Sequence, residues 1–122
     1  ATLAGSPPMN LIPGEMLPDG SVKAGDAHFR LPPHGFAPGR AVEIGLRPED
    51  MVLGQAENAF EMKVDFLEEL GATQLVYGRL NGAQLIVQVP SGSVAEAGGV
   101  LRFGIAADRL HVFDPATGRR AV

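Results

Sequence analysis

The residue patterns that carry nucleophilic or phosphate-binding chemistry in many enzymes are missing from this chain of 122 residues. It has no cysteine, which excludes disulfides, a thiol nucleophile and cysteine-ligated zinc. No Gly-Lys pair is present, so the phosphate-binding pattern G-x-x-x-x-G-K-S/T cannot occur, and the serine pattern G-x-S-x-G is also missing. We therefore expect this chain alone to have no ATPase activity.

The three histidines do not form a convergent metal site in the sequence. Asp26 and His28 could share one face of a strand, but no third ligand lies near them. His34 lies in a proline-rich loop without a neighbouring carboxylate. His111 alternates with apolar residues, which predicts an outward-facing position on a strand.

The paired charges favour structural roles. Glu68 and Glu69 precede Gly71, which is typical of a charged strand end or turn, whereas acid–base pairs usually act across a cleft from separate elements. Arg119 and Arg120 are expected to be a solvated pair near the end of the chain.

Arg47, Pro48 and Glu49 are the most informative charged segment. Residues 41–46 alternate between apolar and other side chains, which predicts a strand, and Pro48 ends it. Because proline fixes the backbone there, Arg47 and Glu49 are expected to project from a rigid corner. This favours a packing role over catalysis, with Arg47 capping carbonyls or pairing with an acidic residue.

Composition limits the fold to short elements in one domain, residues 1–122. The 16 glycines and 10 prolines occur throughout the chain and interrupt helices at high cost. An apolar content of 45% excludes a disordered chain, and a net charge of −4 argues against nucleic-acid binding. No apolar run approaches the roughly 18 residues of a membrane span, and the N-terminal residues lack the basic start of a signal peptide.

About nine short strands are predicted between the glycines and prolines. Residues 9–16 form a strand with a bulge or an edge strand, and residues 21–24 and 27–31 form a hairpin. Residues 60 to about 66 alternate as one strand, and Asn81-Gly82 joins the strands 73–80 and 84–89.

The remaining segments complete an all-β fold, a small closed barrel or sandwich. Residues 32–40 are a loop, residues 93–97 one helical turn, and residues 100–105 and 110–113 the final strands. The side chains predicted to face inward are Val42, Ile44, Leu46, Met62, Val64, Phe66, Leu75, Leu85, Val87 and Val89.

Four segments resemble the region that follows the ATPase domain in sugar-type ABC importer ATPases, of the maltose or glycerol-3-phosphate importer family. They are G-S-P-P-M-N at residues 5–10, G-L-R-P-E-D at 45–50, L-G-A-T-Q-L-V-Y at 70–77 and H-V-F-D-P-A-T-G at 111–118. They occur in the family's order, although Thr73-Gln74 departs from its usual acidic form. The resemblance implies a small OB-like β-barrel of the TOBE/MOP-like class.

The resemblance also implies a function. Residues 1–122 would be a single C-terminal regulatory domain, excised from a longer ABC ATPase chain, that helps to hold the ATPase dimer together. Its partners would be its own nucleotide-binding domain, a second copy of the subunit, the permease subunits and a regulatory protein. ATP and magnesium are expected only in the upstream domain, with no cofactor here. The parent chain would be cytoplasmic and peripheral at the inner face of the plasma membrane, and Arg47, Pro48 and Glu49 are the interface candidates.

Two alternatives of other classes remain open. An oxyanion-binding barrel related to molybdate-binding domains requires convergent amides, hydroxyls or cations, for which Ser91-Gly92-Ser93 is the candidate loop. A nucleic-acid-binding barrel requires a basic groove with exposed aromatic residues, which this acidic chain with one tyrosine and six phenylalanines does not favour.

Overall fold

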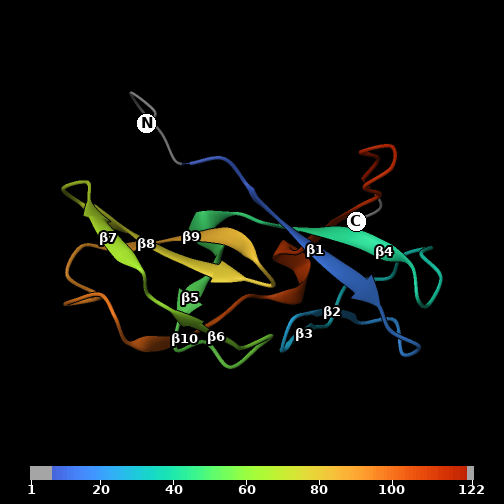
Figure 1. Ribbon diagram of the computed structural model, residues 1–122, viewed down its shortest axis with the longest axis horizontal. Helices are drawn as coiled ribbons and strands as arrows, with labels where there is room; N and C mark the ends of the chain where they lie inside the picture. Colours follow the sequence, from blue (N-terminus) through green and yellow to red (C-terminus); the bar gives the residue numbers. More distant parts are fainter. Residues whose placement is uncertain (1–6, 121–122) are drawn as a thin grey trace.

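The computed structural model describes residues 7–120, which fold into β-strands and two single-turn 3-10 helices, without an α-helix in that range (Figure 1). The all-β prediction is confirmed, with eleven strands in place of about nine. The elements are β1 (Asn10–Met16), β2 (Val22–Ala24), β3 (Ala27–Phe29), β4 (Ala41–Leu46), η1 (Pro48–Asp50), β5 (Val52–Leu53), β6 (Phe60–Lys63), β7 (Phe66–Glu69), β8 (Thr73–Leu80), β9 (Ala83–Pro90), β10 (Val100–Gly104), η2 (Ala107–Arg109) and β11 (His111–Phe113).

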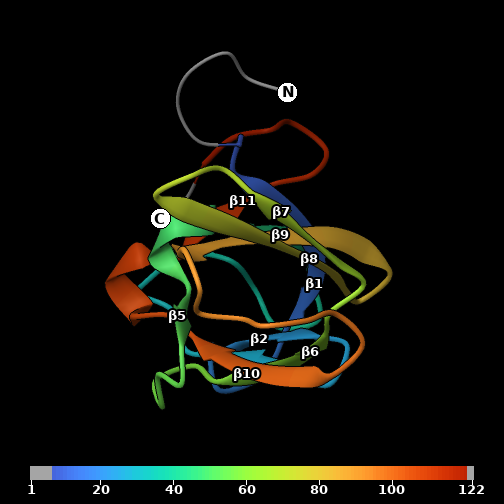
Figure 2. The same cartoon turned by 90° about the vertical axis from the view of Figure 1, so that its left-hand side faces the viewer.

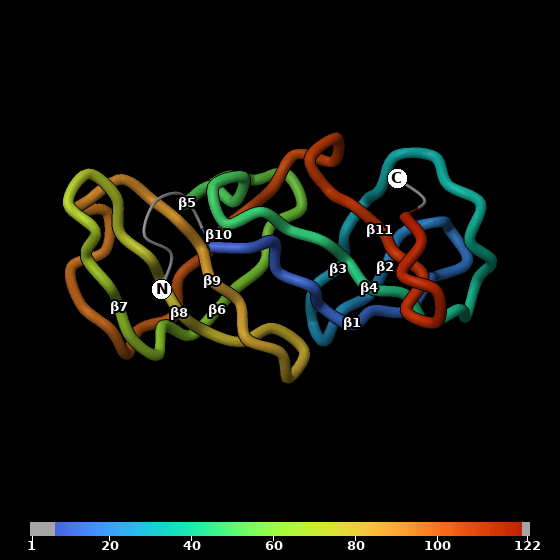
Figure 3. Tube along the Cα trace, turned by 90° about the horizontal axis from the view of Figure 1, so that it is seen from above, coloured from blue at the N-terminus to red at the C-terminus, as the bar shows by residue number. Residues whose placement is uncertain are grey.

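The strands form three antiparallel sheets. Their orders are β11-β4-β1-β2-β3, β5-β10-β6 and β7-β8-β9. Figure 3 shows β7, β8 and β9 at one end of an elongated molecule and β2, β3 and β11 toward the other. Figure 2 looks from the first end, with β7 to β9 on one side of the interior and β6 and β10 on the opposite side. The core therefore lies between the sheets.

Aromatic rings connect the sheets inside this core. The Phe29 ring of β3 meets the Phe60 ring of β6 edge-on at 5.8 Å between centroids, and Phe60 meets Phe103 of β10 at 6.1 Å. Among the residues predicted to face inward, the structure buries Val42, Ile44, Leu46, Met62, Val64, Leu75, Leu85, Val87 and Val89. Leu75 is buried on the Tyr77 face of β8, and Val76 takes its expected place in the core cluster; the alternation pattern located the others correctly.

The predicted burial of Phe66 is wrong, because the segment predicted as one strand is two. β6 ends at Lys63, and the backbone N–H of Asp65 donates to the carbonyl of Tyr77 over 2.8 Å. Phe66 is also paired with Tyr77, so two residues oppose one and form a bulge. The extra residue interrupts the alternation, and Phe66 is 50% exposed.

Two other local predictions are corrected. Residues 93–97 contain no helical turn. β1 is neither bulged nor an outer strand: its register with β4 is continuous from Asn10 to Glu15, and β2 pairs with its other side at Glu15 and Met16. Pro13, which cannot donate to a ladder, lies where only β4 pairs with β1.

Both predicted hairpin turns are confirmed. β2 and β3 pair across Gly25 and Asp26, and β8 and β9 pair across Asn81 and Gly82. Asn81 and Gly82 have φ angles of 50° and 79°, the left-handed region that two-residue hairpin turns require.

Candidate functional site

The Arg47-Pro48-Glu49 corner is a turn between β4 and β5. Arg47 is extended (φ −73°, ψ 137°), as expected for a residue before proline, and Pro48 opens the helix η1. The N–H of Asp50 closes this turn on the carbonyl of Arg47 over 3.0 Å. The backbone is therefore fixed at both ends of the corner.

The structure separates the three corner side chains by exposure. Pro48 is buried, Arg47 is half-buried and Glu49 is exposed. The guanidinium Nη1 of Arg47 lies 2.8 Å from the imidazole Nε2 of His111 on β11. Arg47 thus contacts the next strand of its own sheet, and Glu49 is the corner residue that projects into solvent.

His111 is buried, with 6% exposed, which corrects the prediction of an outward-facing residue. It does lie on the sheet face opposite the core residue Val112, but other groups cover that face. A methyl group built on Gly45, the partner of His111 on β4, would overlap the Met9 sulfur and lie 2.8 Å from the Phe113 ring. The Met9 and Phe113 side chains over this glycine therefore cover His111 on a face that the alternation alone would leave to solvent.

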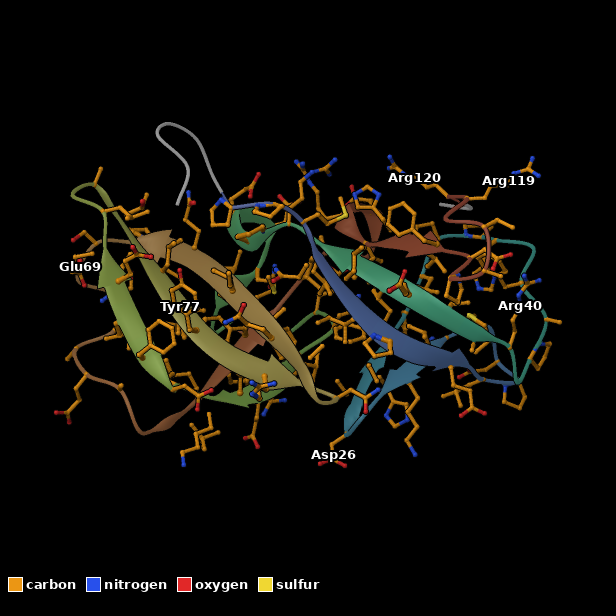
Figure 4. The ribbon with its side chains drawn as sticks, turned by 45° about the horizontal axis from the view of Figure 1, so that its top comes forward. Asp26, Arg40, Glu69, Tyr77, Arg119 and Arg120 are labelled. Carbon is orange, nitrogen blue, oxygen red and sulfur yellow. The ribbon has the colours of Figure 1, made fainter. Side chains whose placement is uncertain are left out.

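The predicted solvated pair Arg119-Arg120 is partly tied to the sheet. Arg120 forms a β-bridge with Phe113, and its guanidinium contacts His111 Nδ1. Asp114 forms an ion pair with Arg40. The final segment thus adds one cation, Arg120, beside His111, at the end of the molecule where Figure 4 labels Arg40, Arg119 and Arg120.

Asp50, next to the corner, is a charged residue that the sequence did not single out. Its Oδ1 atom lies 3.9 Å from Nη1 of Arg109, on η2. Its Oδ2 atom is buried and accepts no hydrogen bond in the described part of the chain. Arg109 is therefore the cation that compensates this carboxylate, and it joins η1 to η2.

Asn10 closes the barrel and was not identified as important from the sequence. Its Nδ2 donates to the carbonyls of Leu46 and Ile86, and its Oδ1 accepts the N–H of Ile86, each over 2.9 Å. The side chain therefore imitates a strand partner for β9 where the β11-β4-β1-β2-β3 sheet meets the β7-β8-β9 sheet. An asparagine at the start of an apolar strand is the one sequence signal for this role.

Gln74 performs a similar function for the loop after β9. Its side chain, 1% exposed, donates to Glu69 and to the carbonyl of Val94, and accepts the N–H of Val94. Gln74, where the sequence departs from the usual acidic form of the family, thus fastens the loop after β9 to β8 at Val94. The neutral amide suits this place because it both donates and accepts.

The loop Ser91–Ser93 is poorly suited to an oxyanion. The Ser91 hydroxyl donates to the Glu69 carboxylate over 3.2 Å, and the Ser93 hydroxyl to the Pro90 carbonyl over 2.6 Å. The amides of both serines also donate to backbone carbonyls, of Ala72 and Pro90. The hydroxyls and amides of both serines are therefore occupied, and the Glu69 carboxylate beside Ser91 would repel an anion.

A groove of about 670 Å³ lies where the β2–β3 and β8–β9 hairpins approach β6 and β10. Its charged lining residues carry both negative and positive charges: Asp26, Glu61, Arg79 and Arg102.

Within residues 7–120, no three His, Cys, Asp or Glu side chains are grouped to hold a metal ion. No helix in that range has the length and apolar character needed to cross a membrane.

Comparison with protein families gives two matches that together span most of the chain. The MalK OB fold domain matches residues 5–51, and the TOBE domain matches residues 44–113. The two matches overlap at residues 44–51, which include the corner. The predicted small OB-like barrel is therefore confirmed.

Individual relatives agree along almost the whole chain. The sn-glycerol-3-phosphate import ATP-binding protein UgpC of Ruegeria sp. (strain TM1040) is 38% identical over 98% of this chain and 34% of its own length. The proteins of the same name from Paraburkholderia xenovorans and Escherichia coli K12 are 40% and 38% identical over 99% and 98% of the chain. The chain thus spans about a third of the length of these relatives.

A solved structure shares the fold. The cytoplasmic molybdate-binding protein ModG, crystallised with molybdate, superimposes with a TM-score of 0.73 over 93% of this chain and all of that one, at 16% identity. This likeness establishes the fold alone. The TOBE match covers more than half of the sequence, and the chain belongs to the TOBE domain family, with a MalK-type OB segment over residues 5–51.

Proposed function

We propose that this chain is a non-catalytic regulatory and dimerisation module of an ABC importer ATP-binding subunit, for import of a sugar or a glycerol phosphate. The observation that carries the proposal is the match along 98–99% of the chain to relatives named import ATP-binding proteins. In that role the chain lies in the cytoplasm, at the inner face of the plasma membrane. Its partners are its own nucleotide-binding domain, a second subunit, the permease subunits and a regulatory protein.

The corner is our candidate for the contact with the second copy or with the nucleotide-binding domain. Its backbone is fixed by Pro48 and by the turn that Asp50 closes, so little conformational entropy is lost on binding. Glu49 is exposed and Arg47 half-exposed, so both charges can be reached. A twofold contact would let Arg47 of one copy meet an acidic residue of the other.

The first prediction concerns self-association. The chain should form a weak dimer. A subunit that dimerises through two domains gains affinity because each contact raises the effective concentration for the other, and this gain is lost when only one domain is present. Changing Arg47 and Glu49 together to alanine should weaken the dimer by about tenfold, since two symmetric exposed ion pairs each contribute under about 1 kcal/mol. Analytical ultracentrifugation over a wide concentration range measures this.

A matched control removes the same charges elsewhere. Arg119→Ala with Glu96→Ala changes two exposed residues outside the corner and should leave the association unchanged. A protein that stays monomeric at high concentration would refute dimerisation. A dimer unaffected by the corner variant would exclude Arg47 and Glu49 from the interface and leave the regulatory role in place.

The second prediction concerns nucleotides. ATP with magnesium should leave the melting temperature of the chain unchanged, because the ATP and magnesium of the proposed subunit bind in another domain. A ligand at a hundred times its dissociation constant would stabilise the native state by about 2.7 kcal/mol, a shift that differential scanning fluorimetry resolves easily. Stabilisation by ATP would contradict the non-catalytic role, and stabilisation by molybdate would favour an oxyanion-binding barrel instead.

A further inference from the structure

The outer edge of β7 carries backbone groups that no strand pairs with. β7 is the terminal strand of the β7-β8-β9 sheet. The backbone N–H of Leu70 donates to the carbonyl of Thr73 over 2.9 Å, so Leu70 is a hydrogen-bonded position. In an antiparallel pair such positions alternate along the strand. In this register Phe66 and Glu68 direct their backbone groups to β8, and Leu67 and Glu69 direct theirs outward. The outward groups are a template for an added strand.

An aromatic ring extends this template on the outer face of the sheet. The Phe66 and Tyr77 rings are stacked, with centroids 4.2 Å apart and planes 14° from parallel. Tyr77 covers the ring face of Phe66 toward β8, so the opposite ring face is directed over the free edge. Phe66 is 50% exposed. Figure 4 shows Tyr77 on this face, at the end of the molecule opposite Arg40 and Arg120.

The charge at this edge is negative and has no cation paired with it in residues 7–120. Glu68 accepts the Tyr77 hydroxyl over 2.8 Å, and this bond raises the pKa of Tyr77. Among the described residues, neither Asp65 nor Glu68 is a member of the ion pairs, which include Arg40 with Asp114 and Arg109 with Asp50. The edge strand also lacks the lysine and proline that commonly block strand addition.

We propose that the β7 edge, defined as Phe66 to Glu69 with Tyr77, binds an extended segment of a partner protein that carries arginine or lysine at alternate positions. Backbone groups of the segment would pair with Leu67 and Glu69, which is recognition by strand addition. Its outward side chains would then lie about 5 Å from those of Phe66 and Glu68, as cross-strand neighbours do. A cation there is attracted by the ring face and by the carboxylate.

The same charges argue against a second copy of this strand as the occupant. Pairing β7 with β7 would bring Glu68 and Glu69 against their own counterparts, and like charges opposite each other destabilise a strand pair. The surface is separate from the corner of Arg47, Pro48 and Glu49. The inference goes beyond the proposed function, and either can fail while the other holds.

The test uses the peptide Thr-Arg-Val-Arg-Val-Arg-Thr, titrated into the chain and followed by NMR. The amides of Leu67 and Glu69 should shift and exchange more slowly with solvent, and binding should weaken as salt is added. A peptide with glutamate in place of arginine, and one with alternate backbone nitrogens methylated, should not bind. Charge attraction without strand addition would instead let the methylated peptide bind equally well, which overturns the proposal.

Variants separate recognition from simple protection of the edge. Glu68→Gln keeps an oxygen for the Tyr77 hydroxyl but removes the charge, and should weaken the arginine peptide about threefold to fivefold. Phe66→Ala should weaken it by a similar factor or more. Glu15→Gln, an equal charge change on β1, should have no effect. If Glu68→Gln leaves peptide affinity unchanged and increases self-association, Glu68 only protects the edge and the proposal is wrong.

Discussion

Replacing Phe103 by alanine is expected to lower the free energy of unfolding by about 3–5 kcal/mol. The side chain is fully buried in β10, and its ring meets Phe60, which in turn meets Phe29. These three rings join the β5-β10-β6 sheet to β3, so the cavity would open where two sheets pack together. Urea denaturation followed by circular dichroism measures the loss, provided that the slope m is unchanged.

Phe66→Ala is the matched control, because the residue type and the truncation are the same. Phe66 is half-exposed and loses only its stack on Tyr77, so the cost should stay within about 1.5 kcal/mol. The sequence pattern alone predicts burial and a large cost for Phe66. Equal losses in the two variants would contradict the bulge that turns Phe66 outward.

Gly104→Ala is expected to destabilise the fold by about 3 kcal/mol, at the upper end of the usual cost of overpacking. A Cβ atom at Gly104 would overlap the carbonyl oxygen of Gln55 and lie 2.6 Å from that of Glu57. Both obstacles are backbone atoms, and the Glu57 carbonyl also accepts the N–H of Ile105 over 2.9 Å. Rotamer changes therefore cannot relieve the clash, and the loop would have to move.

The control for Gly104 is Gly99→Ala. A Cβ atom at Gly99 meets no heavy atom within 4 Å, and this glycine does not have a left-handed φ. Alanine there should be neutral or stabilise by up to about 1 kcal/mol, because it restricts the unfolded chain. Thermal unfolding of the two variants under the same conditions measures the difference. A Gly104→Ala protein as stable as the parent would show that the loop at residues 55–57 can move at little energetic cost, which would contradict the prediction.

Sequence periodicity predicted the strands well where one face of a strand is buried. Residues 41–46 and 84–89 are examples, since their apolar residues alternate and their ends are set by Pro48 and by Asn81-Gly82. Phe66 was misassigned because the chain passes from pairing with β10 to pairing with β8 at Asp65. That transfer depends on where pairing with β10, a strand far along the chain, gives way to the β7–β8 hairpin, and no alternation pattern within residues 60–66 encodes this point.

The candidate site was predictable in part for the same reason. Pro48 identified the corner between β4 and β5, but the contact of Arg47 with His111 depends on β11 lying beside β4. The alternation of apolar and polar residues correctly predicted that His111 lies on the face opposite the core. It contains no information that Met9 and Phe113 cover that face above Gly45. The role of Asn10 likewise requires β1 and β9 to meet, which is a tertiary event.

The order of the strands in the largest sheet has a consequence for how the chain folds. β4 is flanked by β1, from early in the chain, and by β11, from residues 111–113. During synthesis the emerging chain can close the β2–β3 and β8–β9 hairpins, but β4 keeps one unpaired edge until residue 113 has left the ribosome. Folding of this sheet is therefore completed only after translation of β11, and it should be slow, as expected when pairings between distant segments dominate.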